Sequence, residues 1–218
     1  MRKYAEQSNL KKQFFKQTTF KFSKKEIKYF SIKDNYELDE YCQLFFEKFQ
    51  ANPYFVNKWY SMDSFHRFLI KDLKNENLKN KYILELGAGL GITSALLKLY
   101  GYNILPADYQ FSACMLINDS LKINLLDANA VNADWTNPPF KQFDAIIGAD
   151  IIYEKESAEH IFNCISKTVK PNGLIYIANF DNYAYQLLID KLNSKFSKLH
   201  SSHTKNLSHK IIINKFQA

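Results

Sequence analysis

A glycine-rich turn and a carboxylate further along the chain carry the clearest chemical signal in the sequence. The stretch ELGAGLG at residues 85–91 places Glu85, Gly87, Gly89 and Gly91 at two-residue spacing between an apolar segment and a helical one. Glycine at such a turn lets the backbone approach a ligand closely. Asp108 follows about 20 residues later, where a carboxylate can accept hydrogen bonds from both hydroxyls of a ribose. NAD and S-adenosylmethionine both contain such a ribose, so these features leave both cofactors open.

A second acidic position, Asp134 followed by Trp135, closes the third expected core strand, counted from the strand that precedes the glycine turn. If a ribose rests on Asp108, an adenine would lie beside this pair. A carboxylate can accept a hydrogen bond from the exocyclic amine of adenine, and Trp135 offers an apolar wall. The alternative is a loop tryptophan that only covers the core.

Short apolar runs alternate with segments of helical periodicity from residue 81 onward. The pattern predicts helices near residues 91–100, 112–126, 156–168 and 183–196, and strands at residues 82–86, 103–108, 129–134, 143–149, 173–180, 198–204 and 210–216. Nearly continuous apolar strands that alternate with helices predict an α/β fold with a mainly parallel sheet covered on both faces. The connection between the last two strands is too short for a parallel crossover, so one of them must be antiparallel.

The N-terminal region has a different pattern. Alternation in TTFKF and IKYFSI predicts a β-hairpin, and helices are expected near residues 37–50 and 62–69. Residues 1–33 hold ten Lys and Arg against two Glu, so the net charge of +7 comes from this arm. We expect a basic N-terminal extension, residues 1–78, that packs on a core of residues 79–218 to form one compact unit.

Composition narrows the class of protein. A chain of 218 residues with 46% apolar content can form one domain with a full core. No apolar run is long enough to span a membrane, the first residues lack a signal-peptide pattern, and the three cysteines are far apart. The histidines show no metal-ligand spacing, and His66 is expected to be a partly buried helix residue. We therefore expect a soluble, cytoplasmic protein without a metal.

Residues 82–153 resemble the seven-strand S-adenosylmethionine-dependent methyltransferases through YILELGAGLGI, PADYQ, LKIN, ADW and FDAIIGADIIYE. The combination of ADW with GADIIYE is more specific and resembles the protein-lysine methyltransferase family. This resemblance implies a Rossmann-like seven-stranded sheet of order 3-2-1-4-5-7-6 with one antiparallel strand. It also implies S-adenosylmethionine as cofactor and a protein lysine as acceptor.

The resemblance assigns roles to individual residues as well. Residues 85–91 would hold the methionine portion of the cofactor, Asp108 the ribose, and Asp134 with Trp135 the adenine. Asp150 and Tyr153 would face the substrate amine as the catalytic pair. The full set of expected cofactor contacts is Trp59, Glu85, Gly87, Ala88, Gly89, Gly91, Asp108, Tyr109, Asp134, Trp135 and Ala149. Trp59 matches the family only in part, because Tyr60 follows it where the family has proline.

Two short signatures compete for the acceptor position. NPPF at residues 137–140 is typical of enzymes that methylate the amino groups of bases or of glutamine, whereas DIIY at residues 150–153 offers a carboxylate and a phenol to a cationic amine. Ligands bind beyond the carboxyl ends of parallel strands. NPPF precedes the strand at residues 143–149 and DIIY follows it, so only DIIY has the required position. The prolines of NPPF suit a turn, since they cannot donate a ladder hydrogen bond.

The sequence therefore predicts an S-adenosylmethionine-dependent N-methyltransferase that acts on a protein lysine. One alternative keeps the cofactor but changes the acceptor to a small amine or to RNA, with the basic arm adding electrostatic affinity. A second alternative is a cofactor-binding interaction module without transfer activity, against which Asp150 and Tyr153 argue. Nucleic acid is not favoured as a partner, because Arg2 and Arg67 are the only arginines available for bidentate phosphate contacts. No membrane partner is expected.

Overall fold

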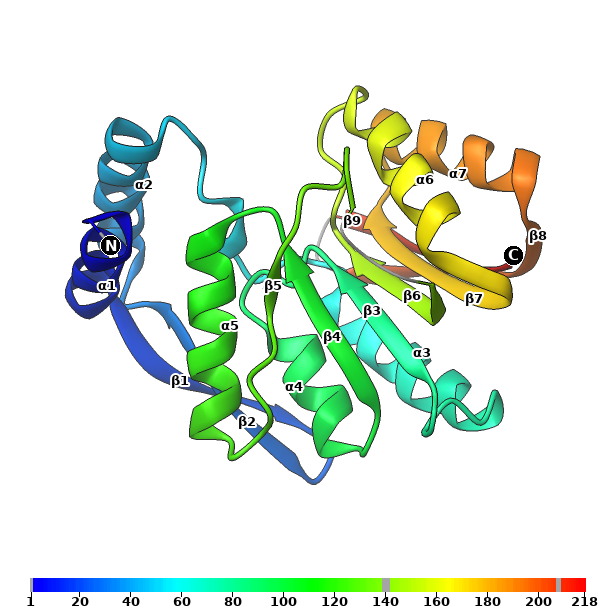
Figure 1. The fold of residues 1–218 in the computed structure, drawn as a ribbon, viewed down its shortest axis with the longest axis horizontal. Helices are drawn as coiled ribbons and strands as arrows, with labels where there is room; N and C mark the ends of the chain where they lie inside the picture. The colour runs from blue at the N-terminus through cyan, green and yellow to red at the C-terminus, as the bar shows by residue number, and fades with distance from the viewer. Residues whose placement is uncertain (1, 139–141, 207–208) are drawn as a thin grey trace.

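A seven-stranded sheet forms the centre of the protein in a computed structural model that describes residues 2–138, 142–206 and 209–218 (Figure 1). Its strand order is β5-β4-β3-β6-β7-β9-β8. All neighbouring strands are parallel except those that pair with β9, which is antiparallel to both β7 and β8. This arrangement confirms the predicted α/β fold, the predicted strand order and the single antiparallel strand.

Strands and helices make up most of the described chain. The strands are β1 Phe15–Phe22, β2 Lys25–Ile32, β3 Tyr82–Leu86, β4 Asn103–Asp108, β5 Val131–Asn132, β6 Phe143–Ala149, β7 Val169–Phe180, β8 Ser197–Asn206 and β9 His209–Gln217. The helices are α1 Arg2–Phe14, α2 Asn35–Phe49, the short 3-10 helix η1 Tyr54–Val56, α3 Met62–Asn75, α4 Ile92–Leu99, α5 Phe111–Ile123, α6 Ser157–Thr168 and α7 Tyr183–Lys195.

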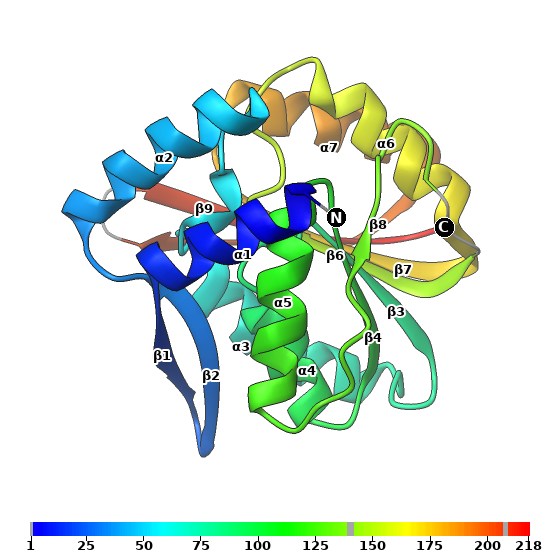
Figure 2. The same cartoon turned by 60° about the vertical axis from the view of Figure 1, so that its left-hand side comes forward.

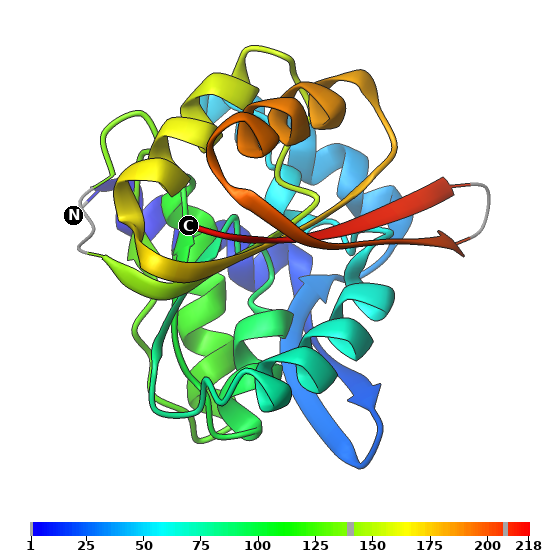
Figure 3. The same ribbon diagram turned by 90° about the vertical axis from the view of Figure 1, so that its right-hand side faces the viewer.

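Helices cover both faces of the sheet. Apolar side chains of α6 and α7 pack on one face, and those of α3 and α4 pack on the other, where α5 also lies (Figure 1 and Figure 3). The strands β3 and β6 are buried along almost their whole length, and β7 is buried over residues 173–179. Both sides of these strands are therefore dry, which explains why their sequences are continuous apolar runs.

One sequence prediction was wrong in detail, and one helix was missed. The third core strand is only two residues long, β5, instead of the predicted residues 129–134. Side-chain amides replace part of its ladder, since Asn118 Oδ1 accepts from Ala130 N at 2.9 Å and Asn129 Nδ2 donates to Ile104 O at 3.3 Å. Helix α1 was not predicted. Leu10 and Phe14 are its only buried apolar side chains among those described, so its sequence has little helical periodicity.

The predicted hairpin is present as β1 and β2, and it packs against α5 and α4. Figure 2 shows α1 crossing in front of α5, with α2 above it. One cluster of buried side chains joins these parts and includes Ile27, Tyr41, Phe45 and Ile117. The edge of β2 is also tied down, because Asn124 accepts from Lys28 N and donates to Lys28 O. The division of the chain at residue 78 remains a prediction, although this cluster crosses it.

Within the described ranges, no helix is long and apolar enough to cross a membrane. The same residues contain no group of three or more His, Cys, Asp or Glu side chains that could hold a metal ion.

Candidate active site

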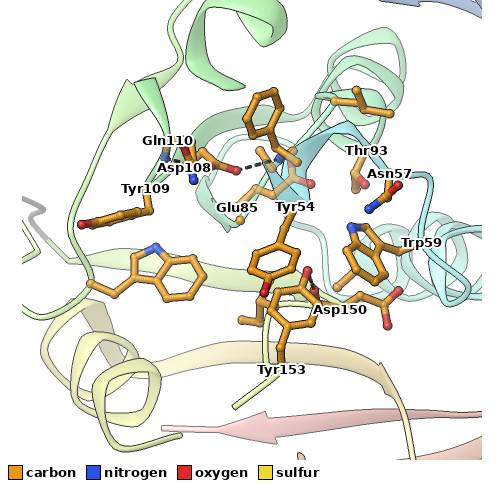
Figure 4. Close-up of a pocket in the computed structure, with 18 of the residues that line it drawn as sticks. Tyr54, Asn57, Trp59, Glu85, Thr93, Asp108, Tyr109, Gln110, Asp150 and Tyr153 are labelled. Carbon is orange, nitrogen blue, oxygen red and sulfur yellow. Dashed lines mark hydrogen bonds between the residues drawn. The ribbon is translucent and has the colours of Figure 1, made fainter. Parts of the chain in front are cut away.

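A cavity of about 440 Å³ opens at the carboxyl ends of β3, β4 and β6 (Figure 4). Its walls come from the glycine turn, the ends of β4 and β6, and a segment of the N-terminal region. We call this last segment, residues 50–61, the strap, because it connects α2 to α3 across the cavity. The predicted site residues that line the cavity are Trp59, Glu85, Gly87, Ala88, Gly89, Asp108, Tyr109, Asp134, Trp135, Ala149, Asp150 and Tyr153. Of the predicted set, only Gly91 is not among the lining residues.

The glycines of the turn are required by the packing of neighbouring side chains as well as by space for a ligand. Gly87, Gly89 and Gly91 all have positive φ, between 53° and 74°. A Cβ on Gly87 would lie 2.6 Å from the Ile151 side chain, and one on Gly91 would lie about 3 Å from Ile117. At Gly89 a Cβ would have only ordinary contacts, the nearest of them 3.5 Å from Phe55 O of the strap. The glycine spacing therefore reflects the packing of neighbouring side chains at two of the three positions.

Asp108 is buried at the end of β4, with one backbone donor on each carboxylate oxygen. Gly89 N donates to Oδ2 and Gln110 N donates to Oδ1, both at 2.9 Å. Burial raises the pKa of Asp108 to about 6, while the backbone hydrogen bonds oppose that rise. Each oxygen keeps a lone pair, because a carboxylate oxygen can accept two hydrogen bonds. The side chain is thus fixed in place and can still accept from a ligand.

Glu85 lies beneath the same turn and is also buried. Its carboxylate accepts a hydrogen bond from the Ser94 hydroxyl at the start of α4. Burial raises the pKa of Glu85 from 4.5 to about 7, and hydrogen bonds from Ser94 and Thr93 oppose the rise. The cavity floor therefore carries two buried carboxylates, neither of which forms a salt bridge with another described residue.

Replacing Glu85 with Gln is expected to remove the loss of folding stability that the wild type undergoes as the pH rises. Because the folded pKa lies above the unfolded one, the stabilising effect of the protonated form is present below pH 4.5 and is lost as the pH rises through 7. The wild-type free energy of unfolding should fall by about 3 kcal/mol relative to the variant between about pH 5 and about pH 8. Urea denaturation of both proteins across this range measures the difference, and parallel pH profiles would contradict it.

Asp134 and Trp135 lie at the cavity, beyond β5. Asp134 is exposed and caps its own turn, since its Oδ1 accepts from both the N–H and the hydroxyl of Thr136 at 2.8 Å. These hydrogen bonds lower the pKa of Asp134. Trp135 is half-buried beside Gly87, and its indole Nε1 is buried without a hydrogen-bond partner among the described residues. This pair forms a wall that is apolar at one end and charged at the other.

The NPPF signature is only partly described. Asn137 is exposed, and its N–H donates to Asp134 O at 3.2 Å in a tight bend. Pro139 and Phe140 lie outside the described residues, so the predicted proline turn remains a prediction there.

Asp150 occupies the turn after β6 in a left-handed conformation, with φ 49°. Its N–H donates to Ala178 O at 2.8 Å. The residue is 1% exposed: Oδ2 accepts from Ser61 N at 3.0 Å and Ser61 Oγ at 2.5 Å, and Oδ1 accepts from Phe180 N at 3.3 Å. Burial raises the pKa of Asp150 and these hydrogen bonds oppose the rise. Asp150 therefore links the end of the strap to the sheet.

Tyr153 contacts two aromatic rings of the strap. Its hydroxyl donates to the backbone carbonyl of Asp150. Its ring centroid lies 5.0 Å from that of Tyr54 and 4.9 Å from that of Trp59 (Figure 4). Ser61 and Tyr54 were not recognised as site residues from the sequence. No local motif marks them, because both meet their partners only across the folded cavity.

His66 is a core residue of α3, in keeping with the expected structural role. Its Nε2 lies 3.0 Å from the Thr93 hydroxyl, and its ring packs edge-on against Phe20 and Phe22 of β1. Burial lowers the pKa of His66 to about 3, so the ring is neutral at physiological pH.

Known structures share this fold. The N-methyltransferase NodS from Bradyrhizobium japonicum WM9, solved in complex with S-adenosyl-L-homocysteine, is 14% identical with a TM-score of 0.59, over 75% of this chain and 93% of that one. An S-adenosylmethionine-dependent methyltransferase from Clostridium acetobutylicum is 12% identical with a TM-score of 0.60, over 82% of this chain and 98% of that one. This chain therefore shares the fold of these two enzymes.

Sequence comparison gives a narrower assignment. The profile of the lysine methyltransferase family matches residues 54–194, and the chain belongs to that family. The protein-lysine N-methyltransferase EFM2 of Saccharomyces cerevisiae is 32% identical over 133 residues, which are 53% of this chain. The match spans about a third (32%) of the yeast enzyme's length.

Proposed function

We propose that this protein transfers a methyl group from S-adenosylmethionine to the side-chain amine of a lysine in another protein. The observation that carries the proposal is that a single cavity joins Asp108, beyond β4, to Asp150 and Tyr153, beyond β6. The carboxylate that we propose for the ribose and the acidic turn that we propose for the amine therefore open into the same cavity. Membership of the lysine methyltransferase family supports this choice of acceptor.

The residues around the cavity fit the proposed cofactor. The free lone pair on each oxygen of Asp108 suits the two hydroxyls of a ribose. Glu85 and the turn from Gly87 to Gly89 would lie against the methionine portion. Trp135 would cover the adenine, and Asp134 would accept a hydrogen bond from the exocyclic amine of that adenine. These assignments, with those of Trp59, Ala88, Gly91, Tyr109 and Ala149, are part of the proposal.

The cofactor would supply an electrophilic methyl group on a positively charged sulfur. The protein must present an uncharged lysine amine to it, and deprotonation at pH 7 costs about 5 kcal/mol. Three donors occupy three of the roughly four acceptor sites of the Asp150 carboxylate, which leaves one site on Oδ1 for the incoming ammonium. The ring of Tyr153 would border the amine, since its hydroxyl is engaged with Asp150 O. The proton would pass to water.

Incubation with methyl-labelled S-adenosylmethionine and a cell extract tests the proposal. We expect label in protein, recovered after complete acid hydrolysis as methylated lysine. Label that survives protease and disappears with nuclease would instead support RNA as the acceptor. Binding of S-adenosylhomocysteine without any transfer would support an interaction module. The Asp108→Ala variant is the matched control for background labelling.

A cytosolic protein is the partner that we propose. All three cysteines are free thiols, and Cys114 and Cys164 are buried, as expected in a reducing compartment. The basic N-terminal extension offers lysines for electrostatic contact with a partner, but Lys11 of α1 is already paired with Asp119 and Lys21 of β1 with Glu26. Nucleic acid therefore remains the less favoured partner.

A further inference from the structure

Tyr54 is an exposed aromatic residue at the cavity that belongs neither to the glycine turn nor to the turn at Asp150. It belongs to the strap, lines the cavity, and is 43% exposed. Its ring is nearly parallel to that of Tyr153, at an interplanar angle of 25°, and Figure 4 shows the two rings together beside Trp59. The three rings line the same cavity as Asp150.

The backbone that carries Tyr54 is held firmly. Gln110 Nε2 donates to Asn52 O at 3.0 Å, which ties the strap to the start of α5. Phe55 and Val56, the next two residues, are buried in the apolar cluster of the N-terminal region. Any movement at this position must therefore be a rotation of the Tyr54 side chain and not a displacement of the strap.

The side chain itself is held weakly. The Tyr54 hydroxyl has one long hydrogen bond, from Asn52 Nδ2 at 3.4 Å. Tyr153, in contrast, is fixed by its hydroxyl bond to Asp150 O, and Trp59 is half-buried against it. Of the three rings, that of Tyr54 can rotate away with the smallest loss of interactions.

Ring centroids 5.0 Å apart are in direct contact, so no cation fits between Tyr54 and Tyr153 as they stand. Ammonium groups bind favourably over the face of an aromatic ring within about 6 Å of its centroid. We propose that Tyr54 is the movable wall of the acceptor channel: its ring leaves the face of Tyr153 when a lysine ammonium enters, and then closes over it. Tyr54 would thus be a specificity-determining residue that selects a cationic side chain, an inference that rests on the proposed function.

Tyr54→Leu and Tyr54→Phe variants test this role with the acceptor protein that the wild type labels in extract. The Leu variant should raise the KM for that acceptor about tenfold, while kcat changes by less than about threefold. The Phe variant keeps the ring and should stay within about twofold of the wild type. Neither should change the affinity for S-adenosylhomocysteine, measured by calorimetry. Tyr82→Leu, at the opposite end of β3, is the control for loss of an exposed tyrosine.

Each possible result of this experiment leads to a different conclusion. An unchanged KM in the Leu variant would overturn the role of Tyr54 and leave the proposed function intact. Weaker binding of S-adenosylhomocysteine by that variant would assign Tyr54 to the cofactor and also overturn the inference. A loss of kcat alone would indicate distortion of the transfer site and would overturn it as well. If the wild type labels no lysine in any protein, the proposed function fails, and this inference fails with it.

Discussion

Replacing Asp150 with Asn is expected to lower methyl transfer by at least about 100-fold, the scale of effect when a preorganised polar group at a reacting centre is lost. The change removes the negative charge that would meet the ammonium. It also puts an NH2 group in place of one carboxylate oxygen, facing either Ser61 N or Phe180 N, and an amide NH2 cannot accept a hydrogen bond from a backbone N–H. Single-turnover transfer to the labelled acceptor protein measures the loss.

Affinity for S-adenosylhomocysteine should remain within about threefold in this variant, since we propose that Asp150 faces the acceptor and not the cofactor. Asp190→Asn, an exposed position on α7, is the matched control and should behave as the wild type. Unchanged turnover in Asp150→Asn would remove Asp150 from the mechanism. A large loss of cofactor affinity would mean that the carboxylate serves mainly to hold the strap over the cofactor site.

Replacing Asp108 with Ala is expected to weaken S-adenosylhomocysteine binding by at least about 100-fold. Each hydrogen bond from a ribose hydroxyl to a charged carboxylate contributes about 1.5–3 kcal/mol, and the variant loses two. It also leaves Gly89 N and Gln110 N without their acceptor, so the glycine turn becomes less well ordered. Isothermal calorimetry at pH 7.5, above the pKa of about 6 of this group, measures the effect with the carboxylate ionised.

Asp127→Ala, on the exposed loop after α5, controls for the loss of one acidic residue. Thermal unfolding of both variants separates lost ligand contacts from lost stability. Binding by Asp108→Ala within about threefold of the wild type would contradict the ribose assignment. Falling affinity in the wild type below pH 6 should accompany the main effect, because protonation removes the acceptor that the ribose needs.

Much of this architecture follows from the sequence because its signals are local. Continuous apolar strands between helical segments predicted the sheet, and the short link before β9 predicted its antiparallel strand. Glu85, Asp108 and Asp150 each follow or close a strand, so the topology alone brings them to one edge. Helix α1 and the short β5 escaped prediction for the converse reason. Few of α1's side chains are buried, and Asn118 and Asn129 replace part of the β5 ladder.

Only the tertiary structure determined which contacts the N-terminal region makes with the cavity and the core. Ser61 meets Asp150 across 89 residues of sequence, and Asn124 meets Lys28 across 96. Tyr54 and Trp59 reach Tyr153 in the same way. Such contacts depend on burial and on the closure of long loops, and neither of these produces a periodic pattern in the sequence. The sequence by itself determined the sheet and the carboxylates at its edge, whereas packing of the strap decided which rings and donors surround them.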